Sequence, residues 1–148
     1  MTRRYVEIPF QLLDIEGDGF HIMIQGKING QKANFIIDTG ASRSVFDPND
    51  IGKYIGNLQL EKKQGVTAGV GSSDLESSTF TIDRLSIGKL DIENYLAVAL
   101  DLDNIHETYG SLNLPKINGI IGGDVLVRYK AVINYKLKKI RLTPDKLP

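Results

Sequence analysis

The sequence contains no cysteine and only two histidines among its 148 residues. The absence of cysteine excludes disulfide frameworks, zinc–thiolate sites, iron–sulfur clusters and cysteine nucleophiles. Two histidines are too few for a multi-histidine metal site within one chain. A chain without cysteine suits a reducing and an oxidising compartment equally, so the sequence does not indicate where the protein is located. The first five residues lack the apolar run of a signal peptide.

An excess of one charge is also lacking, since 18 Lys and Arg balance 18 Asp and Glu. This balance argues against a nucleic-acid-binding protein with a broad basic face and against polybasic attachment to a membrane. No stretch approaches the roughly 18 apolar residues of a membrane span. A net charge of zero gives weak colloidal repulsion, which is compatible with self-association.

What is present is the composition of an ordinary globular protein, with 41% hydrophobic and 24% charged residues. The length fits one domain, so we expect a single domain over residues 1–148. The dominant hydrophobic period is two. In residues 20–25 it predicts a half-buried strand, in which Phe20, Ile22 and Ile24 form the apolar side.

Turn and capping signals place the other elements. Asn29-Gly30 lies between two strand-like runs and predicts a hairpin, because both residues tolerate a positive φ. Asp47 before Pro48 predicts the start of a short helix, and Asp124 is expected to cap another helix over residues 124–129. Residues 102–112 are a weaker helix candidate. The remaining predicted strands cover residues 4–13, 78–87, 92–100, 131–134 and 139–142, a pattern typical of a β-barrel or sandwich.

Two short segments resemble each other. Ile36-Ile37 and Ile120-Ile121 each lead into a small turn that contains glycine. In the first, the strand ends in Asp38, which we expect at the mouth of a barrel in a low dielectric, where ionisation of a carboxylate is expensive. Turn chemistry alone also allows Asp38 to begin an ordinary Asp-Thr-Gly turn.

Three motifs, taken in order, resemble the retropepsin-like, single-lobe aspartic proteases. Asp38-Thr39-Gly40-Ala41-Ser42 follows hydrophobic residues as in the catalytic motif of that family. Residues 119–126 are similar to its second signature, two hydrophobic residues and a glycine that enter a helix. The glycine-rich residues 65–73 stand where the family has its flap hairpin. The resemblance implies a closed antiparallel β-barrel with one to three short helices.

The resemblance also implies a mechanism. Two Asp-Thr-Gly loops meet across a two-fold axis, and the two carboxylates share one proton because both cannot ionise. The ionised carboxylate takes a proton from water while the protonated one polarises the scissile carbonyl. Thr39 would brace the loops and Gly40 would offer backbone groups to the substrate. No metal or organic cofactor is implied.

This sequence has one Asp-Thr-Gly, so the second Asp38 is expected from another copy of the chain, in a homodimer. The expected substrate is an extended peptide or protein segment with apolar side chains beside the cut. Ala41 and Ser42 would line the substrate site. From the flap, Gly69, Val70, Gly71 and Ser72 would bend over the substrate, although a plain glycine-rich loop is the alternative.

The sequence departs from the family pattern at three positions. Ala41 lacks the hydroxyl that pepsin-like members often place there, so we expect a less acidic pH optimum than that of a gastric enzyme. Ser42 and Gly123 stand where retroviral members have an Asp–Arg ion pair that braces the dimer. These departures keep an alternative open, a non-catalytic peptide-binding or regulatory module on the same fold, monomeric or dimeric.

Other polar signals are weaker. Residues 14–19 superficially resemble a calcium loop, but Gln25 stands where an EF-hand needs Glu, and a solvated hairpin turn is the better prediction. His21 is predicted to be a surface histidine. His106 has no obvious acid or nucleophile partner in the sequence.

Overall fold

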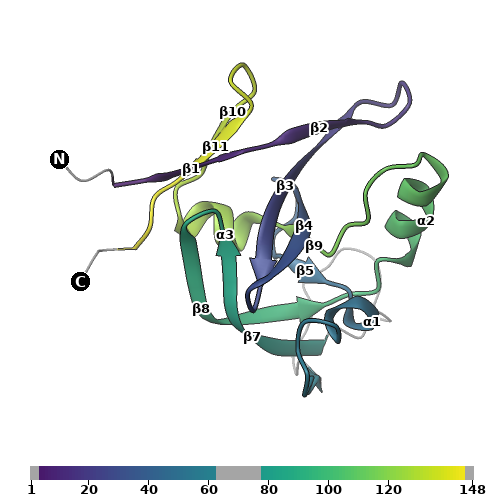
Figure 1. The fold of residues 1–148 in the computed structure, drawn as a ribbon, viewed down its shortest axis with the longest axis vertical. Coiled ribbons are helices and arrows are strands. Elements are labelled where there is room, and N and C mark those ends of the chain that lie inside the picture. The colour runs from purple at the N-terminus through teal and green to yellow at the C-terminus, as the bar shows by residue number, and fades with distance from the viewer. Residues whose placement is uncertain (1–3, 63–77, 146–148) are drawn as a thin grey trace.

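The computed structural model describes residues 4–62 and 78–145, and strands dominate it (Figure 1). The strands, in chain order, are β1 (Val6–Pro9), β2 (Gln11–Asp14), β3 (Phe20–Ile28), β4 (Gln31–Ile37), β5 (Val45–Phe46), β6 (Glu61–Lys62), β7 (Ser78–Ile87), β8 (Leu90–Ala99), β9 (Gly119–Ile121), β10 (Val132–Asn134) and β11 (Lys139–Leu142). The helices are α1 (Pro48–Ile51), α2 (Asp103–Ser111) and α3 (Gly123–Arg128).

The larger sheet closes on itself. Its strand order is β2-β3-β4-β9-β5-β8-β7-β6, and β3 pairs additionally with β7. The strands β3, β4, β9, β5, β8 and β7 therefore form a closed barrel, which confirms the predicted fold class. The β4–β9 and β5–β8 pairings are parallel, whereas the other pairings in this sheet are antiparallel. A separate sheet, β1-β11-β10, joins the first strand to the last two (Figure 1).

The predicted hairpin connects β3 and β4. Asn29 and Gly30 have φ values of 49° and 83°, so both turn residues adopt the left-handed conformation that a tight hairpin requires. The register then places Ile28 opposite Gln31 and Ile22 opposite Ile37. This register brings the start of β3 beside the end of β4, where Asp38 follows.

The predicted burial along β3 was wrong at two positions. Phe20 is 64% exposed, whereas Met23, which the alternation placed on the polar side, is buried. Met23 is buried because a second apolar cluster covers the outside of β3 and β4, so that both faces of the strand are buried in its middle. Phe20 is the first residue of β3. The buried members of this outer cluster are Leu13, Met23, Ile36, Tyr109 and Ile117.

All three predicted helices are present. Asp47 caps α1, since its Oδ1 accepts a hydrogen bond from the backbone N–H of Asn49 at 2.8 Å. The expected cap of the third helix was wrong, because the N-cap of α3 is Gly122 and it makes no side-chain cap bond. Asp124 lies inside the first turn of α3, and its carboxylate is used elsewhere.

The segment that resembles a calcium loop joins β2 to β3 as an exposed turn. Glu16, Gly17 and Gly19 all have positive φ values there. Within the described residues, no helix has both the length and the apolar character that a membrane crossing demands.

Candidate functional site

The two similar segments lie side by side. Strands β4 and β9 pair in parallel, with Ile36 opposite Ile120 and Ile37 opposite Ile121. The backbone N–H of Asp38 extends the pairing by donating to the carbonyl of Ile121 at 2.9 Å. Asp38 is therefore the first residue beyond the buried strand, at the edge of the barrel.

The Asp38 side chain lies in a tight turn that its own loop makes. Its Oδ1 accepts a hydrogen bond from the N–H of Gly40 at 2.9 Å, and its carbonyl accepts one from the N–H of Ala41 at 3.2 Å. Within the parts of the chain that the structure describes, its Oδ2 accepts no hydrogen bond. The residue is exposed, so the expectation of a low-dielectric environment is not met within one chain.

Main-chain bonds join the loop after Asp38 to the start of α3. The N–H of Gly123 donates to the carbonyl of Ala41 at 2.7 Å, and the N–H of Asp124 donates to that of Ser42 at 3.1 Å. A Cβ atom on Gly122 would lie only 2.6 Å from the Ala41 carbonyl oxygen, so only glycine permits this approach. Backbone hydrogen bonds thus link the loop after Asp38 to the start of α3, in the region where Ser42 and Gly123 replace the ion pair expected from the family resemblance.

A network of hydrogen bonds among Ser44, Tyr95 and Asp124 holds this loop in place. Asp124 Oδ1 accepts two hydrogen bonds from Ser44, one from its N–H and one from its hydroxyl, each at 2.8 Å. The Ser44 hydroxyl oxygen accepts in turn from the N–H of Gly122 at 2.9 Å. The Tyr95 hydroxyl donates to Asp124 Oδ2. Burial, with the hydrogen bond to Asp124, raises the pKa of Tyr95, so the phenol stays a donor.

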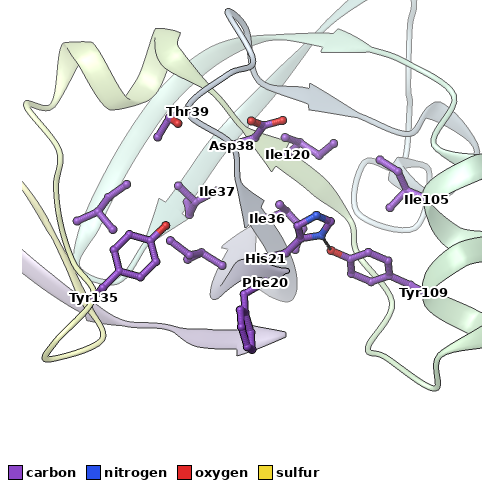
Figure 2. Close-up of a pocket in the computed structure, with 12 residues that line it drawn as sticks. Phe20, His21, Ile36, Ile37, Asp38, Thr39, Ile105, Tyr109, Ile120 and Tyr135 are labelled. Carbon is purple, nitrogen blue, oxygen red and sulfur yellow. Dashed lines mark hydrogen bonds between the residues drawn. The ribbon is translucent and has the colours of Figure 1, made fainter. Parts of the chain in front are cut away.

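A pocket of about 270 Å³ opens beside Asp38 (Figure 2). Isoleucines form half of its wall, and aromatic and polar side chains form the rest. Figure 2 shows Asp38 and Thr39 at one side, with Phe20, His21 and Tyr109 opposite. The lining residues are Phe20, His21, Ile22, Ile36, Ile37, Asp38, Thr39, Ile105, Tyr109, Ile120, Ile133 and Tyr135.

The structure brings together some of the residues predicted for the site. Asp38 and Thr39 line the pocket, whereas Gly40, Ala41 and Ser42 lie in the adjoining loop without lining it. The predicted flap residues Gly69, Val70, Gly71 and Ser72 lie outside the described residues.

Sequence reasoning missed the far wall of the pocket. His21 is exposed, as predicted, but its place in the pocket wall was not foreseen, and Tyr109 was not considered. Tyr109 lies in α2, which no local motif links to Asp38. An exposed polar position on the strand paired with β4 was the one available signal for His21.

His106 has the acidic partner that the sequence did not reveal. Its Nδ1 lies 3.6 Å from Asp47 Oδ2, and its Nε2 lies 2.9 Å from the carbonyl oxygen of Ile117. The side chains of Asp47, Asp103 and His106 lie close enough together to hold one metal ion. However, both Asp47 oxygens already accept backbone N–H groups, from Asn49 and Leu102, so the group serves to tie α2 to α1.

Comparisons with known proteins agree with this geometry. The aspartyl protease family matches residues 24–125, which include β4, Asp38, β9 and the start of α3. A curated relative from Malassezia globosa, a probable inactive secreted aspartyl protease, is 24% identical over 136 residues. The match covers 82% of this chain and 34% of the relative, so the chain spans about a third of the length of that protein.

Two solved structures share the fold. A retropepsin-like aspartic protease from Rickettsia conorii has a TM-score of 0.58 and 21% identity, covering 95% of this chain and 90% of that one. The retroviral protease-like domain of Ddi1 from Leishmania major has a TM-score of 0.55 and 16% identity, covering 86% of this chain and 90% of that one. At these identities the likeness concerns the fold.

Proposed function

Since the chain belongs to the aspartyl protease family, we propose that it is an aspartic endopeptidase that acts as a homodimer. The observation that carries the proposal is the placement of Asp38. Its carboxylate is exposed at the edge of the barrel, one of its oxygens accepts no hydrogen bond within the described residues, and a pocket lined by isoleucine, aromatic and polar side chains lies beside it.

Two such carboxylates are needed for the chemistry. One must accept a proton from water while the other, protonated, donates to the carbonyl oxygen of the scissile bond. When the two lie close together, mutual repulsion keeps one protonated, so the pair supplies both roles at once. Each chain contributes one Asp-Thr-Gly, and a second copy supplies the other.

The exposure of the loop supports this assembly. Asp38, Thr39 and Gly40 are all exposed in the single chain, although β4 before them is buried. A two-fold partner placed on this edge would cover both copies of the loop and create the low-dielectric environment that one chain lacks. Thr39 would then brace the paired loops, and Gly40 would face the substrate.

A second candidate function is peptide binding without cleavage. The curated relative is described as probably inactive, and one chain alone holds an unpaired Asp38. The same pocket and loop could hold an extended peptide in a monomer, or in a dimer whose two carboxylates do not meet.

Mixing active and inactive chains tests the proposal. Wild-type protein and the Asp38→Asn variant are co-refolded in varied proportions, and cleavage of a peptide library is measured between about pH 4 and 7. If two Asp38 carboxylates are required, activity falls as the square of the wild-type fraction, to about a quarter in an equal mixture, because chains pair at random. Sedimentation of the wild type reports the dimer. A strict monomer that cleaves no peptide would refute the protease proposal and favour the binding module.

A further inference from the structure

His21 and Tyr109 form a contact that the proposed mechanism does not use. They lie 88 residues apart, on β3 and α2, and His21 Nδ1 lies 2.5 Å from the Tyr109 hydroxyl oxygen. Their rings stack with centroids 5.8 Å apart. Both side chains line the pocket beside Asp38 (Figure 2).

We take the Tyr109 hydroxyl as the donor in this contact, an arrangement that places the proton of neutral His21 on Nε2. Burial raises the pKa of Tyr109 to about 12, so its hydroxyl keeps its proton at ordinary pH and can donate to Nδ1. Neutral His21 then carries its own proton on Nε2. Protonated His21 has a proton on both nitrogens. In either state Nε2–H is a donor, and within the described residues it has no hydrogen-bond partner.

The rest of the pocket suits a large apolar group. Six of its twelve lining residues are isoleucines, and Phe20, Tyr109 and Tyr135 add aromatic rings. An apolar cavity of about 150 Å³ holds a benzene molecule, so a volume of about 270 Å³ accommodates an aromatic side chain with a polar tip. Figure 2 shows the second ring nitrogen of His21 on the side away from Tyr109, facing the Asp38 side of the pocket.

We propose that this pocket selects a substrate side chain with a large aromatic body and an acceptor oxygen at its tip, of which tyrosine is the natural example. His21 Nε2 donates to that oxygen and is the specificity-determining group. Tyr109 is a positioning residue, because it acts by orienting His21 and fixing its proton. This inference rests on the proposed function, since the pocket is taken to be part of a peptide-binding cleft.

Peptide binding to the Asp38→Asn variant tests the inference without requiring cleavage. Extended peptides that carry tyrosine, phenylalanine or leucine at one position, scanned along the sequence, are titrated and their dissociation constants measured. At one position we expect tyrosine to bind more tightly than phenylalanine by roughly three- to tenfold, the ratio that one hydrogen bond provides. Equal affinities at every position would overturn the inference.

Variants in the same background identify the residues responsible. His21→Phe keeps a ring but removes the donor, and Tyr109→Phe removes only the hydroxyl. Both should bring the tyrosine-to-phenylalanine ratio close to one while binding of the phenylalanine peptide is retained. Tyr54→Phe is the matched control, because it removes a hydroxyl that donates to the carbonyl of Lys32 outside the pocket, and the ratio should persist. A ratio that survives His21→Phe would refute the assignment.

The outcome separates this inference from the proposed function. If the wild type cleaves peptides but no position prefers tyrosine, the protease proposal stands and the selective pocket is refuted. If the Asp38→Asn variant binds with the expected preference but the wild type cleaves nothing, the pocket is supported and the function is peptide binding. If peptides are neither bound nor cleaved, both proposals fail.

Discussion

Two carboxylates follow the isoleucine pairs of β4 and β9, and the molecule places them in opposite environments. Asp38 comes directly after its pair, is exposed, and accepts one side-chain hydrogen bond, from its own loop. Asp124 comes three residues after its pair, is half-buried, and accepts from both polar groups of Ser44 and from the Tyr95 hydroxyl.

The difference shows that the distance of a carboxylate from the end of its strand decides whether its oxygens stay free or accept structural hydrogen bonds. A carboxylate that already accepts three hydrogen bonds from fixed donors has little acceptor capacity left for a proton or a water molecule. Asp124 is therefore a structural group that holds the loop between Asp38 and Ser44. Asp38 keeps acceptor capacity, so it is the carboxylate to which we assign the proposed catalysis.

The largest expected effect is on catalysis, through Asp38→Asn. If the proposed function is correct, peptide cleavage should fall by about a hundredfold or more, since the substitution removes the acid–base carboxylate from both chains of the homodimer. The free energy of unfolding should change by less than about 0.5 kcal/mol, because the side chain is exposed and asparagine can still accept from Gly40. Steady-state cleavage and urea unfolding measure the two effects. Unchanged cleavage would remove Asp38 from the chemistry.

Gly122→Ala should disturb the contact between the two carboxylate segments. The new Cβ would lie 2.6 Å from the carbonyl oxygen of Ala41 and 2.9 Å from that of Arg43, and neither backbone group can move freely. We expect a loss of about 3 kcal/mol in the free energy of unfolding. Gly52→Ala is the control, because nothing lies within 4 Å of its Cβ position and its φ is −58°. Equal stabilities for the two variants would contradict the close approach.

Asp124→Asn applies the same chemical change as Asp38→Asn to the half-buried carboxylate. Asparagine keeps one acceptor oxygen but cannot accept from both Ser44 and Tyr95 as the carboxylate does. The expected loss is about 2 kcal/mol of unfolding free energy, against almost none for Asp38→Asn. A double-mutant cycle with Tyr95→Phe should give less than the sum of the single effects, because both variants remove one shared bond. Additive effects would contradict the network.

The sequence predicted those parts of the fold that depend on local signals. The Asn29-Gly30 turn, the Asp47 cap and the resemblance between the two isoleucine pairs each depend on a few neighbouring residues, and all agree with the structure. Asp124 was predicted to be a cap because it stands at the start of a helix. Its real partners, Ser44 and Tyr95, are 80 and 29 residues away, and no periodicity reveals such pairings.

Long-range contacts are also the reason why the sequence did not predict the far wall of the pocket. The burial of Met23 was missed because the alternation assumed one covered face on β3, whereas the outer cluster covers the second face as well. Tyr109 reaches His21 only because α2 packs there. Such contacts depend on how distant elements meet, so the sequence could predict the turn that follows β4 but not the residues opposite it.

A third carboxylate, Asp50, extends the comparison to pH and has the smallest expected effect. It is buried, its Oδ2 accepts from the Asn118 side-chain amide at 2.6 Å, and Lys116 Nζ lies 3.0 Å from its Oδ1. Burial alone raises the pKa of Asp50, but the hydrogen bond from Asn118 and the ammonium of Lys116 outweigh it and leave that pKa below its usual value.

A lowered pKa in the folded state makes Asp50 stabilising above its unfolded pKa of about 4, and the contribution is lost as the pH falls through the folded value. Asp50→Asn should therefore cost about 1 kcal/mol of unfolding free energy at pH 7 and less as the pH falls below about 4, where wild type and variant converge. Urea unfolding at several pH values measures the convergence. Asp83→Asn, at an exposed position, is the control and should leave the curve unchanged. Curves for wild type and Asp50→Asn that stay parallel down to pH 2 would show that folding does not depend on the ionisation of Asp50.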